Sequence, residues 1–119
     1  MNILVIDDDK DFLFLLKKRI SKQGHEVYTA VNGINALDEM DQHKIDVVVS
    51  DVVMRDTPIM SLTCTLKQLY PHTPIILISG LPNEPNINNS LSLGADDFVP
   101  KPINMHQLMN SIERLGGHA

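Results

Sequence analysis

Acidic side chains follow two short apolar runs of the sequence, at points where buried strands are expected to end. Asp7-Asp8-Asp9 comes directly after the apolar residues 3–6, and Asp51 closes the run that begins at position 46. Carboxylates within a few ångström repel each other, so their grouping is costly unless it holds a proton, a divalent cation or an incoming phosphoryl group. The pattern therefore predicts a functional site built from Asp7, Asp8 and Asp51.

Three apolar runs of strand length would position these acids. The runs at residues 3–6, 46–49 and 75–78 are rich in Val, Ile and Leu and are nearly continuous, which is typical of parallel strands covered on both faces. Weaker strands are expected at residues 26–30 and 97–100. The sequence therefore predicts five strands.

Stretches with helical spacing separate the strands. One stripe contains Phe12, Leu15, Leu16 and Ile20, and a second contains Ile34, Leu37 and Met40. Further helices are expected near residues 59–69, 86–93 and 104–115, and the dipeptide Asp96-Asp97 is expected to form a solvated turn.

The alternation of strands and helices predicts an α/β fold. In a chain of 119 residues, right-handed crossovers lead to a doubly wound, flavodoxin-like sheet of five parallel strands in the order 2-1-3-4-5, because an eight-fold barrel needs about twice this length. Ligands of such sheets bind outside the carboxyl ends of the strands, where the strand order reverses. In this chain the first and third strands meet there, and they end in Asp7-Asp8 and Asp51.

Composition narrows the class of protein. The length fits one domain, here residues 1–119, and Gly116-Gly117-His118-Ala119 is expected to be a frayed tail or a linker trimmed from a longer protein. Ten basic and fifteen acidic residues give a net charge of -5, which argues against direct binding to nucleic acid or to an anionic membrane. The single Cys64 excludes an internal disulfide, and no signal peptide or membrane-length apolar run is visible, so we expect a cytoplasmic setting.

Two further polar residues fall at the ends of expected strands. Ser79 follows the run 75–78, and Lys101 follows the strand expected at 97–100. Together with the acids they suit phosphoryl transfer to a carboxylate: Asp7 and Asp8 would hold Mg²⁺, Asp51 would attack, and Ser79 and Lys101 would bind phosphoryl oxygens.

These residues resemble the receiver domains of two-component response regulators, chemotaxis-type proteins of the same α/β class. The resemblance covers essentially the whole chain. Five motifs carry it, in the expected order: Ile3-Leu4-Val5-Ile6-Asp7-Asp8-Asp9, Asp46-Val47-Val48-Val49-Ser50-Asp51-Val52-Val53-Met54, Ser79-Gly80, Gly94-Ala95-Asp96-Asp97-Phe98 and Lys101-Pro102.

The resemblance implies a chemistry for this site. Asp51 would take a phosphoryl group from a phosphohistidine on a sensor histidine kinase or a phosphotransfer protein. Mg²⁺, for which Mn²⁺ would substitute, would be held by Asp8, Asp51 and the carbonyl of Val53, with Asp7 supporting it through water. The domain would catalyse only its own phosphorylation and dephosphorylation, so it is not expected to be an enzyme with an external substrate.

The resemblance also implies a switch. Ser79 would move toward the phosphoryl group and Phe98 would turn inward, which would reshape the face made by the fourth helix, fifth strand and fifth helix. A cis peptide between Lys101 and Pro102 would aim the lysine inward. The output would pass to a downstream protein or to an output domain outside this chain, and phosphorylation would promote homodimer formation.

The sequence departs from the family pattern after Met54. The family usually has a proline and then a glycine there, whereas this chain continues Arg55-Asp56-Thr57-Pro58, which predicts a differently shaped loop. Val53 stands at a position that faces the attacking water in the family, so its apolar side chain predicts slow loss of the phosphoryl group.

Two alternatives remain open from the sequence. A haloacid-dehalogenase-like phosphatase would use Asp7 as its nucleophile, although it usually has Thr or Val where Asp11 stands and a longer chain. A degenerate receiver would bind partners without being phosphorylated.

Overall fold

The described residues form a single parallel sheet. The computed structural model describes residues 1–80 and 94–117, and within them five strands are ordered β2-β1-β3-β4-β5. The strands are β1 (Asn2–Ile6), β2 (Glu26–Ala30), β3 (Val47–Asp51), β4 (Ile75–Ser79) and β5 (Asp97–Pro100). All neighbouring pairs are parallel, so the predicted α/β class and strand order are confirmed.

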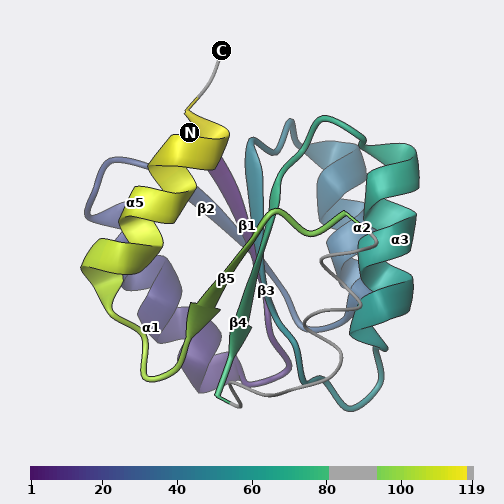
Figure 1. Cartoon of the computed structure of the whole chain (residues 1–119), viewed down its shortest axis with the longest axis horizontal. Helices are drawn as coiled ribbons and strands as arrows, with labels where there is room; N and C mark the ends of the chain where they lie inside the picture. The colour runs from purple at the N-terminus through teal and green to yellow at the C-terminus, as the bar shows by residue number, and fades with distance from the viewer. Residues whose placement is uncertain (81–93, 118–119) are drawn as a thin grey trace.

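Helices cover both faces of the sheet. Those in the described ranges are α1 (Lys10–Ser21), α2 (Gly33–Gln42), α3 (Ile59–Leu69) and α5 (Met105–Gly116). Figure 1 shows α1 and α5 on one side of the sheet and α2 and α3 on the other. The helix expected at residues 86–93 lies outside the described residues. No helix in the described part is long and apolar enough to cross a membrane.

Side-chain caps start three of these helices where the sequence turns polar. The carboxylate of Asp9 accepts hydrogen bonds from the backbone N–H groups of Asp11 and Phe12, at 3.0 and 3.2 Å. Asn32 and Asn104 cap α2 and α5 in the same way. Such caps satisfy amides that have no partner inside the helix and contribute about 1 kcal/mol each.

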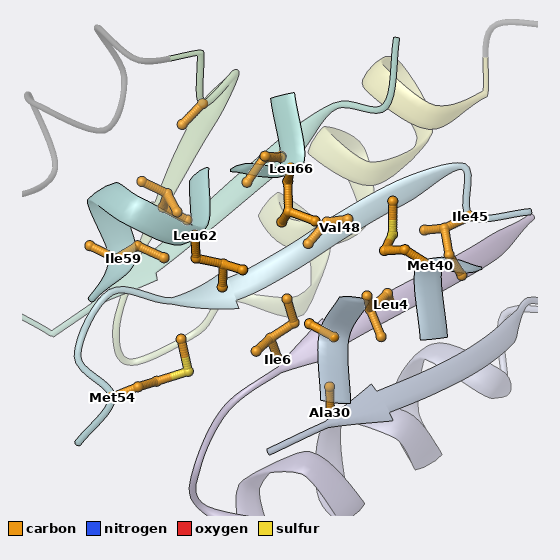
Figure 2. Packing of buried hydrophobic residues seen from close by; sticks show 14 of the residues in the cluster. Leu4, Ile6, Ala30, Met40, Ile45, Val48, Met54, Ile59, Leu62 and Leu66 are labelled. Atoms are coloured by element: carbon orange, nitrogen blue, oxygen red, sulfur yellow. The ribbon is translucent and has the colours of Figure 1, made fainter. Parts of the chain in front are cut away.

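The alternating side chains of the strands divide the core between the two helical layers. Ile3 and Val5 pack with residues of α1 and α5, whereas Leu4 and Ile6 pack with residues of α2 and α3. Figure 2 shows the second cluster, in which Leu62 and other side chains of α3 lie over the sheet. Each fully buried aliphatic side chain contributes about 1.5–3 kcal/mol, so these two clusters account for most of the hydrophobic stabilisation.

Two members of the predicted apolar stripes lie on the solvent side of their helices. Leu15 is 47% exposed and Ile34 is 74% exposed, so these two members of the stripes do not face the core. The core-facing residues of α1 are Leu13, Leu16 and Ile20. The predicted stripe therefore does not coincide with the buried face of α1. The helix contains several apolar residues, so helical spacing alone does not identify which face is buried.

The expectation of a solvated turn at Asp96-Asp97 was correct only in part: Asp96 is exposed and precedes β5, but Asp97 belongs to the strand and both carboxylates are bonded. Asp96 Oδ2 accepts a hydrogen bond from the backbone of Ile75 at 2.8 Å and pairs with Lys67 Nζ at 2.9 Å. Asp97 begins β5 and bonds to Ser111 and to Arg114 of α5. These carboxylates attach β5 to its neighbours.

The end of the chain is helical further than expected. α5 extends through Gly116, and the Gly117 N–H donates to the carbonyl of Glu113 at 3.1 Å. A Cβ added at Gly116 would lie 2.9 Å from the Met1 sulfur and 3.1 Å from the Val47 Cβ. Gly116 therefore permits a close approach of α5 to the start of the sheet.

Candidate functional site

The predicted site residues lie at one edge of the sheet. Asp7 follows β1, Asp51 and Ser79 are the last residues of β3 and β4, and Lys101 follows β5. Because all the strands are parallel, their carboxyl ends meet at the lower end of the sheet in Figure 1. The fold therefore brings together chemical groups that come from four separate stretches of the sequence.

Asp51 lies at the centre of this edge with both carboxylate oxygens engaged. Its Oδ1 accepts a hydrogen bond from the Val53 N–H at 3.3 Å, and its Oδ2 is 3.2 Å from Lys101 Nζ. β3 is buried along its length, and Asp51 itself is 8% exposed. The arrangement presents a carboxylate at the end of a rigid strand, next to a fixed positive charge.

Two contacts besides the pairing with Asp51 hold Lys101 in place, and the peptide bond to Pro102 is cis. The backbone N–H of Lys101 donates to the Ser79 carbonyl at 2.8 Å. Its ammonium also lies 4.8 Å from the centre of the Phe12 ring, within the range of a cation–π interaction. The lysine is thus directed over α1 toward Asp51.

Asp7 is the most deeply buried acid of the site. Its Oδ1 accepts a hydrogen bond from the Asp9 N–H at 2.9 Å, whereas its Oδ2 is buried and receives no donor from the described residues. Burial raises the pKa of Asp7 to about 7, and the negative charge of Asp51 acts in the same direction, against the Asp9 hydrogen bond and the Lys101 charge. The apoprotein therefore holds a carboxyl group that is poorly stabilised as an anion.

Asp8 is directed toward the loop that follows β3. Its Oδ2 accepts a hydrogen bond from the Arg55 N–H at 3.0 Å and lies 3.7 Å from Arg55 Nε. The hydrogen bond from the Arg55 backbone, more than the guanidinium charge, lowers the pKa of Asp8. In the part of the chain that the structure describes, no three Asp, Glu, His or Cys side chains converge as a formed metal site.

The donor set nevertheless fits a hard divalent cation. One oxygen of Asp7 is buried and accepts no hydrogen bond from the described residues, and the charge of Asp51 lies close enough to raise the pKa of Asp7. Mg²⁺ binds through a few carboxylates and keeps several waters, so it requires no cage of protein ligands. A cation here would offset the repulsion between Asp7 and Asp51, provided that Asp8 turned away from Arg55.

The two residues expected to form the switch lie in β4 and β5, which follow β3 in the order of the sheet. Ser79 is buried at the end of β4, one position beyond Ile78, which pairs with Asp51. Phe98 pairs in register with Leu77 of β4 and is half-buried against the cluster under α3. Their placement is compatible with the role that the resemblance implies.

Sequence reasoning missed two contacts at this site. Nothing in the spacing of Phe12 indicated its contact with Lys101. The pairing of Arg55 with Asp8 had a partial signal, because the sequence departs from the family pattern at Arg55, but the departure alone did not identify a partner 47 residues away.

Comparison of the sequence with known proteins identifies a family. The family model of the response regulator receiver domain matches residues 3–113. The transcriptional regulatory protein CpxR of Escherichia coli K12 is 34% identical over 113 residues, which are 95% of this chain and 48% of CpxR. The nisin biosynthesis regulatory protein NisR of Lactococcus lactis subsp. lactis is 32% identical over 93% of this chain and 48% of NisR. The chain thus spans about half the length of these curated relatives.

Solved structures agree with this match over nearly the full chain. A two-component response regulator from Clostridium difficile has a TM-score of 0.90 at 25% identity, covering 97% of this chain and 94% of that one. The Francisella response regulator 1452 receiver domain has a TM-score of 0.87 at 29% identity, covering 98% and 96%. The chain belongs to the family of response regulator receiver domains, which act in two-component signal transduction.

Proposed function

We propose that Asp51 is the phosphoacceptor of this receiver, and that the phosphoryl group comes from a phosphohistidine of a sensor histidine kinase or a phosphotransfer protein. The observation that carries the proposal is the position of Asp51, at the end of a buried strand and 3.2 Å from Lys101 Nζ. An oxygen of Asp51 would form the new P–O bond as the P–N bond of the donor breaks. Because the transferred phosphoryl group is charged, the protein contributes mainly by positioning the reacting groups and by stabilising their charge.

The residues of the site divide these tasks. Asp8, Asp51 and the Val53 carbonyl, supported by Asp7, would hold Mg²⁺ or Mn²⁺, and that ion offsets negative charge on the transferred group. Lys101 pairs with Asp51 before the reaction and would pair with a phosphoryl oxygen afterwards. The hydroxyl of Ser79 would donate to another phosphoryl oxygen.

The signal would leave through the face that includes β5 and α5. A phosphoryl group that attracts Ser79 would favour an inward position of Phe98, which begins half-buried in β5. The partner would be a downstream protein, an output domain outside this chain or a second phosphorylated copy. The relatives CpxR and NisR are named as regulatory proteins of which this chain covers only a part, which supports an output domain or a separate partner.

The proposal is tested by the intact mass of the protein after incubation with acetyl phosphate and Mg²⁺. We expect the addition of one phosphoryl group, and its removal by hydroxylamine, which cleaves acyl phosphates. The same incubation with EDTA in place of Mg²⁺ should give no addition. A protein that gains no mass with acetyl phosphate or with histidine kinases would instead be a receiver that binds partners without being phosphorylated.

Val53 provides a further prediction, for the lifetime of the phosphorylated form. The Val53 side chain is 59% exposed beside Asp51 and cannot hydrogen-bond a water that attacks the phosphoryl group. Because one such hydrogen bond is worth about 1 kcal/mol, we expect Val53→Asn to shorten the half-life roughly fivefold. The half-life is measured by the decay of the phosphorylated mass after the donor is removed. Val53→Ile is the matched control, and a Val53→Asn protein that decays more slowly than wild type would contradict the prediction.

A further inference from the structure

Arg55 connects the loop after β3 to the acidic loop after β1. Its backbone N–H donates to Asp8 Oδ2 at 3.0 Å, and its Nε lies 3.7 Å from the same oxygen. The other acids of the site have different partners: Asp51 Oδ2 is bonded to Lys101, and Asp7 Oδ1 to the Asp9 backbone. Arg55 is therefore the cation that the structure places against Asp8.

The neighbours of Arg55 fix the position of its backbone. Met54 is buried in the core under α3, where Figure 2 shows it together with Ile6 and Ile59. On the other side of Arg55, the hydroxyl of Thr57 accepts a hydrogen bond from the Gly33 N–H at 2.9 Å. With an anchor on each side, the loop holds the Arg55 backbone next to Asp8, while the side chain remains 88% exposed.

This contact opposes binding of a cation at Asp8 in two ways. The oxygen that accepts the Arg55 hydrogen bond has fewer lone pairs left to coordinate an ion. The guanidinium, which is charged at every relevant pH, also repels a second positive charge a few ångström away. Because the side chain is exposed and flexible, it can leave Asp8 at a small energetic cost when an ion arrives.

We propose that the guanidinium of Arg55 is a positioning group that pairs with Asp8 in the apoprotein and competes there with the divalent cation, so that it weakens Mg²⁺ binding. The inference rests on the proposed function, since it assigns the ion to the same acids. Release of the Arg55 guanidinium from Asp8 would accompany ion binding, while Met54 and Thr57 keep the backbone of the β3–α3 loop in place.

The test is the affinity of the unphosphorylated protein for Mg²⁺ and for Mn²⁺, measured by calorimetric titration at low ionic strength. We expect Arg55→Ala to bind both ions about two- to fivefold more tightly than wild type, the range that an exposed ion pair supports. Arg55→Lys, which keeps the charge, should lie nearer to wild type. The advantage of Arg55→Ala should shrink in 0.5 M NaCl (roughly a 4 Å screening length), because salt screens exposed charges.

Arg19→Ala is the matched control, since Arg19 is exposed at the far end of α1 and its loss changes the net charge equally. Equal affinities of wild type and Arg55→Ala, or an equal gain in Arg19→Ala, would overturn the inference. Phosphorylation by acetyl phosphate is measured on the same samples. If wild type gains the phosphoryl group but Arg55→Ala binds ions no more tightly, the inference fails alone. If no variant binds an ion or gains mass, the proposed function fails with it.

Discussion

Replacement of Asp7 by Asn is expected to stabilise the apoprotein by about 2–4 kcal/mol at pH 8, and to raise its melting temperature by roughly 5–15 °C. Burial raises the pKa of Asp7 from 3.8 to about 7, and each pKa unit corresponds to about 1.4 kcal/mol. An Asn side chain keeps an oxygen for the Asp9 N–H, which now donates to Asp7 Oδ1. Its amide can also donate toward Asp51, so the substitution removes the charge and leaves the packing intact.

The stabilisation should depend on pH in a defined direction. Below the unfolded-state pKa of 3.8, Asp7 is protonated in both states and carries no penalty. Between 3.8 and about 7 the unfolded chain releases the proton while the folded protein retains it, so wild-type stability falls as pH rises. Above about 7 the folded protein carries the buried charge and the penalty is complete. The advantage of Asp7→Asn should therefore be largest at pH 8 and small near pH 4.

The measurement is the thermal unfolding of wild type and Asp7→Asn in EDTA across this pH range. Asp38→Asn, which removes an exposed carboxylate from α2, is the matched control and should change the melting temperature little at any pH. A melting-temperature difference for Asp7→Asn that is the same at low and high pH would show that its charge is not the cause. Addition of Mg²⁺ should raise the melting temperature of wild type more than that of the variant, because ligand binding stabilises the form that binds it.

The destabilisation that we expect from Asp7 is typical of a site for a cation and an anion to which neither ligand is bound. The same fold would be more stable with an amide side chain at position 7, yet the carboxylate lies beside Asp51, where the proposed ion would bind. Asp7 therefore links the stability of the apoprotein to the chemistry proposed for Asp51.

The sequence was sufficient to predict the sheet and the edge that carries the site. Runs such as residues 75–78 contain only Val, Ile or Leu over the length of a strand, and few structures other than a doubly covered parallel strand fit them. Once the strand order follows from the alternation of strands and helices, the position of Asp51 next to Asp7 is a geometric consequence. That part of the prediction needed no side-chain detail.

The remaining contacts were not predictable because they depend on rotamers and on small rotations of helices. The sequence does not show that the carboxylate of Asp96 has partners, but in the structure it contacts both Lys67 and the N–H of Ile75, the first residue of β4. Leu15 has the helical spacing of a core residue, yet Leu15 is exposed because Leu13 lies on the buried face of α1. The pairing of Arg55 with Asp8 likewise depends on two buried neighbours of Arg55, Met54 and Thr57, whose anchoring is visible only in three dimensions.

Replacement of Asp51 by Asn is expected to abolish incorporation of the phosphoryl group, a loss of at least about a thousandfold in rate. An amide keeps the shape of the side chain and can still accept the Val53 N–H, but it offers no anionic oxygen to attack phosphorus. Asp7→Asn should slow the reaction without abolishing it, because Asp7 would only support the ion. Intact mass after incubation with acetyl phosphate and Mg²⁺ measures both variants against wild type.

The two variants also separate the receiver from the phosphatase considered from the sequence. A phosphatase that uses Asp7 as its nucleophile would hydrolyse a generic phosphomonoester, would lose this activity in Asp7→Asn and would keep it in Asp51→Asn. The geometry argues against that outcome, because Asp7 is 1% exposed and its raised pKa disfavours the anion that would have to attack. Asp51 has Lys101 beside it to hold a transferred phosphoryl group, so the loss should fall on Asp51→Asn.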